Sequence, residues 1–281
     1  MRYEEHLEHI LQKVEKPGRY LGREWNAVRK DPSKVSVKVA LAFPDLYEVG
    51  MSYLGQKILY GILNAHPSIL AERVFAPGED LEKELRESGL PLFSLENRIP
   101  LHKFDIVGVS LLYELNYSNV LTILDLGGIP LLSQKRNKDM PLVVGGGPAA
   151  FNPEPVSEFF DLFLIGDGEE AFLEIIQTFL EERAKDASKR DLLKALGRIN
   201  GVYVPRFYRT VRSEKSPLLA VRPERGFPTK IQKRVLGRLD GAPFPKDIVV
   251  PNTGIIFDRV AYEVARGCPQ KCRFCQAASI Y

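Results

Sequence analysis

The chain has 281 residues, of which 44% are hydrophobic and 27% charged, enough to bury one or two ordinary cores. No uninterrupted apolar run approaches the roughly 20 residues that span a bilayer, and residues 1–16 are charged throughout, which excludes a secretory signal. We therefore expect a cytoplasmic protein that does not enter a membrane.

The net charge of +3 hides an uneven distribution. Residues 181–246 carry 17 Lys and Arg against 7 Asp and Glu, an excess of +10. The remainder has 22 basic and 29 acidic residues, a sum of −7. The sequence thus places a basic block between two other regions.

Residues 1–34 have the pattern of an amphipathic helix followed by an irregular arm. From Val35 on, apolar segments typical of buried strands alternate with helical patterns. The expected strands are 35–43, 69–77, 105–112, 141–147 and 160–166. The expected helices are 56–66, 78–89, 116–128 and 169–186, the third with Asn116 or Ser118 as its cap.

Continuous apolar strands that alternate with helices indicate a parallel sheet covered on both faces. We therefore predict a doubly wound, Rossmann-type α/β domain over residues 35–190. Ligands of such folds bind at the carboxyl ends of the strands. The polar or glycine-rich loops expected at those ends are 44–50, 110–114, 145–155 and 166–170.

The sequence pattern changes after this domain. Residues 201–211 alternate like a strand, and prolines and arginines then dominate, which predicts a small, basic, β-rich connector over 191–257. The last region, 258–281, begins with one apolar strand, 259–268, that leads directly into a cysteine loop.

All three cysteines, Cys268, Cys272 and Cys275, stand within eight positions. They cannot form a disulfide framework, and thiolates at these spacings on a loop indicate a metal centre. A closed site needs four ligands and no histidine stands nearby, so the pattern predicts a centre with one open position. Spacing alone leaves half of a zinc site, a CxxC redox pair and buried structural thiols open as alternatives.

The run CPQKCRFC, with an aromatic residue before its third cysteine, resembles the radical S-adenosylmethionine (radical SAM) family. The resemblance implies that the thiolates hold three irons of a 4Fe-4S cluster, that S-adenosylmethionine chelates the fourth, and that Phe274 lies beside the adenine. It also implies a reductant such as flavodoxin or ferredoxin. The reaction would be one-electron cleavage to methionine and a 5′-deoxyadenosyl radical that abstracts a substrate hydrogen.

The segments FPDLYEVGMSYLGQKILY, VVGGGPAAFNPEPVSEFFD and IGDGEEAF extend the resemblance to a cobalamin-binding type of domain joined to a radical SAM domain, in an uncharacterised bacterial subgroup. This resemblance spans most of residues 20–281. The barrel of that family normally needs about 200 further residues, and six follow Cys275. We therefore expect the front portion of a longer enzyme, inactive by itself.

Cobalamin domains of this kind carry Asp-x-His-x-x-Gly, with the histidine as lower cobalt ligand, then Ser-x-Leu and Gly-Gly. Asp45, Tyr47 and Gly50 fit the first frame, with tyrosine in the histidine position. A neutral phenol is a poor cobalt ligand. The resemblance therefore implies either cobalamin bound with no histidine on the metal, as a methyl donor, or a fold that has lost the cofactor. Plain loop packing is another interpretation of Tyr47.

The other residues of the expected cofactor rim follow later strands. Ser110 and Leu112 belong to the Ser-x-Leu frame, and Gly145 and Gly146 to the glycine pair. The remaining members are Gly147, Gly166, Gly168 and Glu169. The loop that holds the last three is equally well explained as a turn with acidic residues at a helix N-terminus.

The favoured prediction is thus a cobalamin-dependent radical SAM enzyme whose substrate the sequence does not specify. An RNA-associated module that docks through residues 201–246 is a second hypothesis. Its charges would be Arg206, Arg209, Arg212, Arg222, Arg225, Lys230, Lys233, Arg234 and Arg238, and its aromatics Tyr203, Phe207, Tyr208 and Phe227. A solvated β surface facing an acidic neighbour explains the same residues, and a zinc-stabilised scaffold is a third hypothesis.

Overall fold

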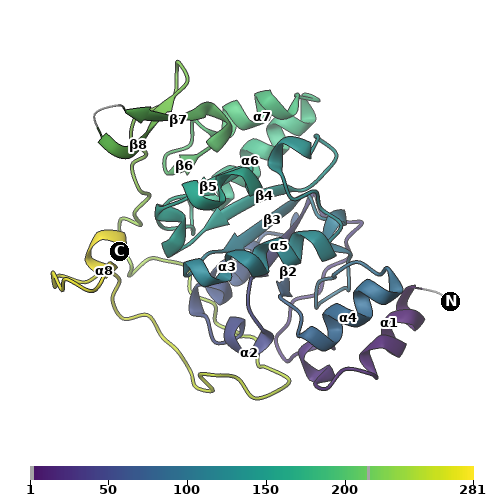
Figure 1. The fold of residues 1–281 in the computed structure, drawn as a ribbon. Helices are drawn as coiled ribbons and strands as arrows, with labels where there is room; N and C mark the ends of the chain where they lie inside the picture. The colour runs from purple at the N-terminus through teal and green to yellow at the C-terminus, as the bar shows by residue number, and fades with distance from the viewer. Residues whose placement is uncertain (1–2, 214–215) are drawn as a thin grey trace.

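The computed structural model describes residues 3–213 and 216–281, and the side chains of 4–211 and 220–281. One six-stranded sheet has the order β2-β1-β3-β4-β5-β6 (Figure 1). Its strands are β1 (Val37–Phe43), β2 (Ile69–Phe75), β3 (Ile106–Ser110), β4 (Leu142–Gly146), β5 (Leu162–Leu164) and β6 (Val202–Tyr203). β1 to β5 are parallel and β6 is antiparallel to β5. The prediction of a mostly parallel α/β sheet is confirmed.

The helices cover both faces of this sheet (Figure 1). They are α1 (Tyr3–Leu11), α2 (Tyr47–Gly50), α3 (Leu54–Ala65), α4 (Glu79–Ser88), α5 (Tyr117–Leu126), α6 (Ala171–Ala184), α7 (Lys189–Leu196) and α8 (Ala277–Ile280). Val39 and Leu41 of β1 belong to the core that includes α3, α6 and α7, whereas Ala40 and Ala42 belong to the core with α1, α4 and α5. Alternate side chains of a strand point to opposite faces, so one buried strand serves both cores.

The direction of the sheet's connections reverses beside β1. The chain runs from β1 to β2 on one side and then crosses to β3, β4 and β5 on the other. Such a switch point, at the carboxyl ends of parallel strands, is where ligands bind in open α/β sheets. The topology alone therefore selects the edge at which a site is expected.

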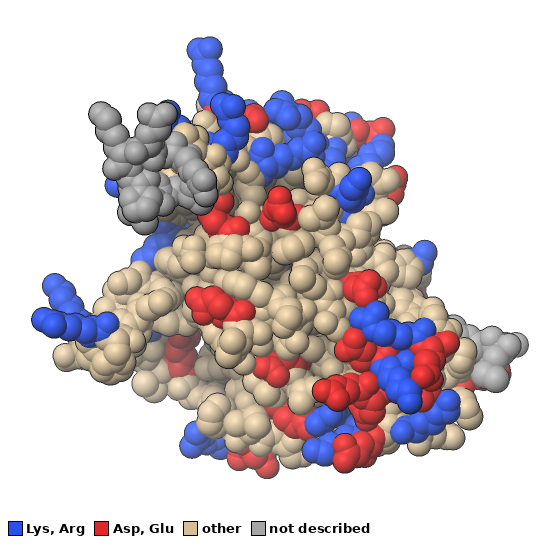
Figure 2. Space-filling view, in the orientation of Figure 1, with Lys and Arg blue, Asp and Glu red and all other residues tan. Residues whose placement is uncertain are grey.

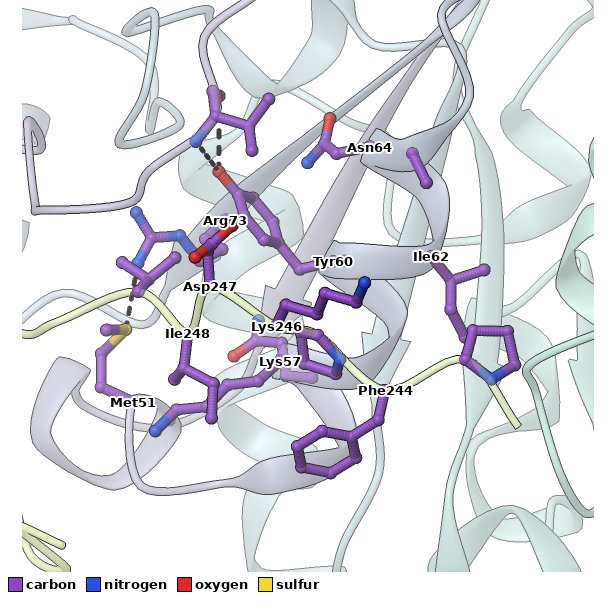
Figure 3. Close-up of a pocket in the computed structure, with 18 residues that line it drawn as sticks. Met51, Lys57, Tyr60, Ile62, Asn64, Arg73, Phe244, Lys246, Asp247 and Ile248 are labelled. Atoms are coloured by element: carbon purple, nitrogen blue, oxygen red, sulfur yellow. Dashed lines mark hydrogen bonds between the residues drawn. The ribbon is translucent and has the colours of Figure 1, made fainter. Parts of the chain in front are cut away.

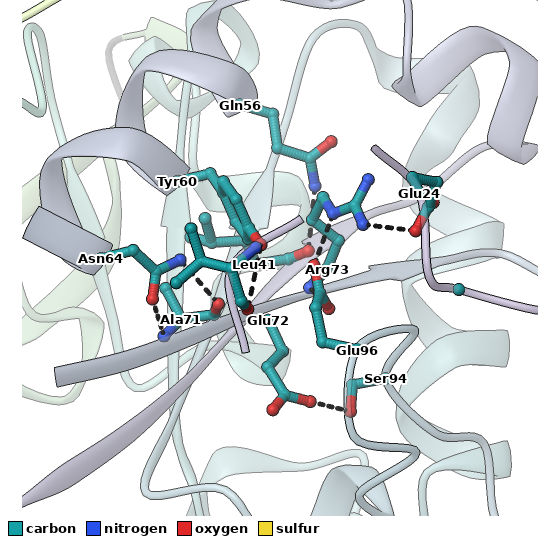
Figure 4. Close-up of polar contacts among 12 residues, drawn as sticks. Glu24, Leu41, Gln56, Tyr60, Asn64, Ala71, Glu72, Arg73, Ser94 and Glu96 are labelled. Atoms are coloured by element: carbon teal, nitrogen blue, oxygen red, sulfur yellow. Dashed lines mark hydrogen bonds and ion pairs between the residues drawn. The ribbon is translucent and has the colours of Figure 1, made fainter. Parts of the chain in front are cut away.

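The edge strand β2 is covered by polar side chains of α3 (Figure 4). The Asn64 amide donates to the Ala71 carbonyl (2.9 Å) and accepts from the Ala71 N–H (3.1 Å). About two turns earlier on the same helix, Gln56 donates to the carbonyl of Leu41 on the neighbouring strand β1 (2.9 Å). Since an open edge strand offers unpaired backbone groups to other chains, these bonds both satisfy the edge and fix α3 against the sheet.

A buried charge cluster joins distant parts of the chain (Figure 4). Arg73 of β2 donates through Nε to Glu96 (2.6 Å) and through Nη2 to Glu24 (3.0 Å), and both carboxylates are fully buried. Glu24 also accepts a hydrogen bond from the Tyr47 hydroxyl (3.3 Å). Burial by itself lowers the pKa of Arg73, but the carboxylates of Glu96 and Glu24 outweigh it and raise that pKa. The N-terminal arm and the loop 90–100 are thereby tied to the sheet.

The β-rich connector predicted over 191–257 differs from the structure, since it begins within the helix α7 and its first strand, β6, joins the main sheet. The strand expected over 201–211 is divided into β6 and β7 (Tyr208–Ser213) by a 3-10 turn at Pro205–Phe207. Proline has no N–H to donate to a ladder, and its fixed φ suits the first turn of a helix. β7 then pairs with β8 (Ser216–Pro223) as a separate two-stranded antiparallel sheet.

The strand expected over 259–268 is wrong for this structure. Among the described residues of 258–281 no strand occurs, and Val260 and Val264 are 89% and 85% exposed. A strand is stable only when its N–H and C=O groups pair with a neighbour, and this segment has no such neighbour in the described chain. None of the described helices combines the length and apolar character needed to cross a bilayer.

The charge cluster leads to a stability prediction. Glu96→Ala should lower the free energy of unfolding by about 3–5 kcal/mol, because Arg73 would keep its charge in the interior with half of its compensation removed. Urea unfolding followed by circular dichroism measures the change. As a control, Glu82→Ala removes a carboxylate that pairs with Arg86 on the surface of α4, and it should change stability little. Equal effects of the two substitutions on stability would contradict the conclusion that Glu96 compensates the buried charge of Arg73.

Candidate functional site

A cavity of about 430 Å³ opens at the carboxyl ends of the parallel strands. We call it the rim cavity. Its floor is formed by the ends of β1, β3, β4 and β5, and its walls by the first turns of α3 and α6, the turn after β4 and the C-terminal segment. Its lining includes Ser110, Gly146, Gly147, Gly168, Glu169 and Arg266. The cavity thus lies at the switch point that the topology selects.

Half of the cofactor residues predicted from the sequence line the rim cavity. These are Ser110, Gly146, Gly147, Gly166, Gly168 and Glu169. The others, which do not line it, are Asp45, Tyr47, Gly50, Leu112, Gly145 and Phe274. The later strand ends therefore build one site, whereas the first frame and the cysteine loop lie outside its lining.

Glycine occupies the rim positions for different physical reasons. A Cβ on Gly146 would meet no atom nearer than 3.9 Å, so this position leaves space open. Gly147 has φ +108°, and a Cβ there would lie 2.7 Å from the Leu111 carbonyl oxygen. At Gly166 (φ +104°) a Cβ would lie 2.1 Å from the carbonyl oxygen of Arg234. Gly146 and Gly147 thus shape the cavity, and Gly166 admits the connector.

Tyr47 lies in the core, with 1% of its surface exposed. Its ring meets Phe75 edge-on at 5.4 Å, and its hydroxyl accepts a hydrogen bond from the Asn252 N–H (3.0 Å) while donating to Glu24. Burial, followed by the nearby Glu24, raises the pKa of Tyr47. A Cβ on Gly50 would lie 2.2 Å from the Phe75 ring. These contacts support the packing interpretation of Tyr47 and Gly50.

The other predicted residues outside the lining also have structural partners. The carboxylate of Asp45 accepts from the Tyr113 hydroxyl (3.0 Å) and the Asn116 amide (3.2 Å), which fixes the loop after β3. Leu112 packs on the core beneath α3 and α6. A Cβ on Gly145 would lie 2.7 Å from the Phe163 ring. Asp45 joins two strand-end loops without entering the cavity.

Arg266 closes one side of the rim cavity and was not predicted from the sequence. Its guanidinium forms ion pairs with Asp167 (3.0 Å), Glu169 (2.6 Å) and Glu263 (2.8 Å). Hydrogen bonds, above all the one to Glu263, raise the pKa of Arg266. The signal available in the sequence was charge complementarity, because the acidic loop before α6 needs a cation and Arg266 stands two positions before Cys268.

The cysteines themselves are exposed. Cys268, Cys272 and Cys275 are free thiols, and Phe274 is 91% exposed. No group of three or more His, Cys, Asp or Glu side chains among the described residues is arranged to hold a metal ion. The structure brings the stem of the cysteine loop to the rim cavity without gathering the thiolates, and the cluster ligands stay a prediction.

A second cavity, of about 320 Å³, separates α3 from residues 243–249 of the connector (Figure 3). Tyr60 of α3 and Arg73 of β2 line it on one side, and Phe244 and Lys246 line it from the connector. Burial, followed by the charge of Arg73, lowers the pKa of Lys57 on its wall. Gly50 is the one predicted site residue in this lining. Because Arg73 already pairs with Glu24 and Glu96, its charge is not free to bind a ligand in this cavity.

The basic connector divides into an internal and an external part. Arg234 pairs with Glu170 (3.1 Å), its N–H donates to the Ile165 carbonyl (2.8 Å), and its carbonyl accepts from the Asp167 N–H (2.9 Å). Lys233 donates to the carbonyl of Ile280 (3.1 Å). Lys233 and Arg234, which we call the internal strap, hold the connector against the end of β5 and the C-terminal segment. Arg206, Arg209, Arg222, Arg225, Lys230 and Arg238 are exposed, and the side chain of Arg212 lies outside the described part.

The fold and the rim cavity define an α/β protein with a cavity at the carboxyl ends of its parallel strands. Residues 55–205 match the family described as "Radical SAM proteins, N-terminal", and the chain belongs to this family. The match includes the rim cavity from Gly55 to Phe172 and ends before the cysteines. The radical SAM relationship predicted from the cysteine pattern is thereby confirmed.

The chain is similar to the uncharacterized protein MJ0966 of Methanocaldococcus jannaschii. The two are 25% identical over 251 residues, which cover 88% of this chain and 43% of the relative. The chain thus spans less than half of the length of this curated relative. No solved structure matches the chain.

The ion pairs of Arg266 lead to a prediction about the C-terminal segment. Arg266→Ala should speed amide hydrogen exchange over residues 277–281 by about tenfold or more, because local opening becomes easier once the contacts that hold a segment are lost. Exchange followed by mass spectrometry measures the change. Arg273→Ala removes an exposed arginine of the same segment and should leave the exchange unaltered. Unchanged exchange in Arg266→Ala would show that these ion pairs do not hold the segment.

Proposed function

We propose that this chain is the N-terminal part of a radical SAM enzyme in which the rim cavity holds the nucleotide tail of cobalamin and the loop 268–275 holds a 4Fe-4S cluster. The observation that carries the proposal is the composition of the cavity wall. Residues 263–267, which lead directly into Cys268, complete a wall whose other parts come from the strand ends. A ligand in the cavity and the cysteine loop therefore share one segment of chain.

The cavity residues suit the tail of cobalamin, a heteroaromatic base on a ribose phosphate. The hydroxyl of Ser110 lines the cavity and makes no hydrogen bond to another described residue, so it is free to bind a ring nitrogen. Gly146 leaves open the space that a side chain would fill. Leu41, Val144 and Leu164 supply an apolar floor. Ligand pockets commonly combine an apolar lining with a few polar groups that orient the ligand.

None of the described histidines lines the rim cavity in which the cobalamin tail would bind. Tyr47 is buried against Phe75 and does not line the rim cavity. His66 follows the last turn of α3, whereas the cavity contacts the first turns of that helix. His102 lies 3.2 Å from the Gly127 carbonyl oxygen. This placement supports a cobalamin bound without a histidine ligand.

The chain's own residues would have separate tasks. Cys268, Cys272 and Cys275 would ligate three irons and leave one iron open, and Arg266 would hold the stem of that loop against the cavity. When bound, the cluster and cobalamin supply the electron that cleaves S-adenosylmethionine and the methyl group for transfer. The apolar floor excludes water, and the protein's contribution is to position the cofactors. The class of reaction that we propose is radical methylation or a related radical modification.

The metal part of the proposal has a direct test. The full-length protein, reconstituted without oxygen, should be brown and bind about four irons per chain. Cys268→Ala, Cys272→Ala or Cys275→Ala should each remove the cluster, because each thiolate is required as a ligand. Ser279→Ala changes an exposed residue of the same segment and serves as the control. Stoichiometric zinc without iron would overturn the radical interpretation.

The cobalamin part has a separate test. Gly146→Leu should lower the affinity for cobalamin by about tenfold or more, because a leucine would fill space that one side of the ligand needs. Binding to the folded, iron-loaded protein is measured by the visible spectrum of cobalamin. Gly254→Leu is the matched control, because Gly254 does not line the rim cavity and a Cβ there would meet no atom within 4 Å.

Electron paramagnetic resonance of the Co(II) form adds a second measurement. The bound cobalamin should lack the extra nitrogen splitting that a lower imidazole ligand produces. Splitting that disappears in His66→Ala or His102→Ala would contradict the placement. Iron binding with no cobalamin binding by the folded protein would remove the cobalamin proposal and leave the radical SAM proposal standing.

A further inference from the structure

The β7–β8 hairpin presents two arginines side by side. Arg209 of β7 and Arg222 of β8 are direct cross-strand partners, and both are exposed. Residues directly opposite on antiparallel strands project from the same face, about 5 Å apart at their Cβ atoms. The hairpin is a sheet of its own and projects from the body of the protein (Figure 1).

Further cations flank this pair. Arg206 precedes β7, Arg225 follows β8, and Lys230 lies a few residues beyond, all exposed. Within the described side chains, none of the five makes a salt bridge. Glu224, at the base of the hairpin, is already paired with Arg190 (3.2 Å). Figure 2 shows Lys and Arg gathered over the part of the molecule where Figure 1 places α7 and this hairpin.

Folding alone does not account for this arrangement. Like charges placed directly opposite on a sheet destabilise it, and the described residues supply no carboxylate to Arg209 or Arg222. A polyanion would offset the repulsion. Arginine in particular presents a planar fork of donors that matches a phosphate. The pattern therefore fits a partner with regularly spaced phosphates.

The aromatic and apolar side chains of the hairpin and its flanks limit the kinds of partner that it can bind. Phe207 is fully buried and stacks on Phe227 at 4.3 Å, and Tyr203 is buried, so these aromatics form no platform for unstacked bases. Val221, 37% exposed, is the one large apolar side chain exposed among the side chains of the hairpin that the structure describes, which do not include 212–219. These described side chains offer little apolar surface for insertion into a membrane interface.

The sequence of the hairpin and its flanks favours recognition by shape. Residues 201–230 contain no Asn, Gln or His, and amide side chains are the usual readers of adenine in the major groove of DNA. Double-stranded RNA is recognised mainly by its shape and its phosphates, across a wide and shallow minor groove. Arginine can also read guanine in that groove, but no amide side chain stands beside the cations of the hairpin. Contact with phosphates alone, which needs no base reader, matches the second mode.

We infer that the β7–β8 hairpin docks double-stranded RNA through its phosphates, with Arg209 and Arg222 at the centre and Arg206, Arg225 and Lys230 around them. In the view of Figure 1 the hairpin and the C-terminal segment project from the same side of the molecule. Lys233 and Arg234 belong to the internal strap and take no part. The inference rests on the hairpin alone and is independent of the cofactor proposal.

The test measures binding of the full-length protein to a fluorescent RNA duplex of about 16 base pairs, by anisotropy over a range of salt concentrations. Up to five phosphate contacts predict that log K falls against log salt with a slope of roughly −4. Arg209→Glu combined with Arg222→Glu should weaken binding by about tenfold or more and reduce the slope by about 2. The double variant again places like charges opposite each other, as in the unmodified hairpin, so thermal stability should stay the same.

A matched control and competitors decide between explanations. Lys83→Glu combined with Lys103→Glu makes the same change of charge at exposed positions of α4 and the turn before β3, and its affinity should stay within about twofold of the unmodified protein because the contact phosphates are unchanged. A DNA duplex of equal length and anionic vesicles should bind more weakly. Tighter binding to either, RNA binding that ignores the arginine substitutions, or no RNA binding by the folded protein would each overturn the inference. A loss of thermal stability in the arginine variant would instead indicate an acidic neighbour within the protein.

Discussion

The guanidinium of Arg73 lies in the interior, and carboxylates from two distant segments neutralise it there. Glu24 comes from the N-terminal arm and Glu96 from the loop before β3. Since an isolated charge cannot remain in such surroundings, both segments must stay in place when the sheet forms. Through Glu24 the hydroxyl of Tyr47 joins the cluster, and Tyr47 in turn accepts from the N–H of Asn252 at the far end of the connector. One buried cation thus organises the arm, the first strand-end loop and the return of the chain.

The return of the chain is what completes the rim cavity. After β6 the connector runs back along the end of β5, where Gly166 admits the backbone of Arg234. Arg266 then reaches the acidic loop before α6 through Asp167 and Glu169. The cavity is therefore composite, built from strand ends of the α/β domain and from the segment that carries the cysteines. Its chemistry depends on contacts between residues about 100 positions apart.

The basic block of the sequence contains two kinds of cation that only burial separates. Arg234 has an acidic partner and holds the internal strap in place, whereas Arg209 and Arg222 face each other without a carboxylate from the side chains that the structure describes. A paired and partly buried arginine contributes to the fold, whereas an exposed pair of like charges weakens the sheet that carries it. The local excess of positive charge predicted a surface, and the structure shows that part of it is internal.

The sequence by itself determined the α/β class, the main strands and helices and the edge of the sheet at which the rim cavity lies, because apolar periodicity and helix signals are local properties. It also located Ser110 and Gly146, since residues that follow parallel strands meet at one edge. Tertiary structure decided the rest. Tyr47 entered the core because Phe75 and Glu24 surround it, and Arg266 became part of the cavity because its partners lie far away in the chain. Neither position can be derived from neighbouring residues, since the free energy that selects it comes from contacts between distant segments.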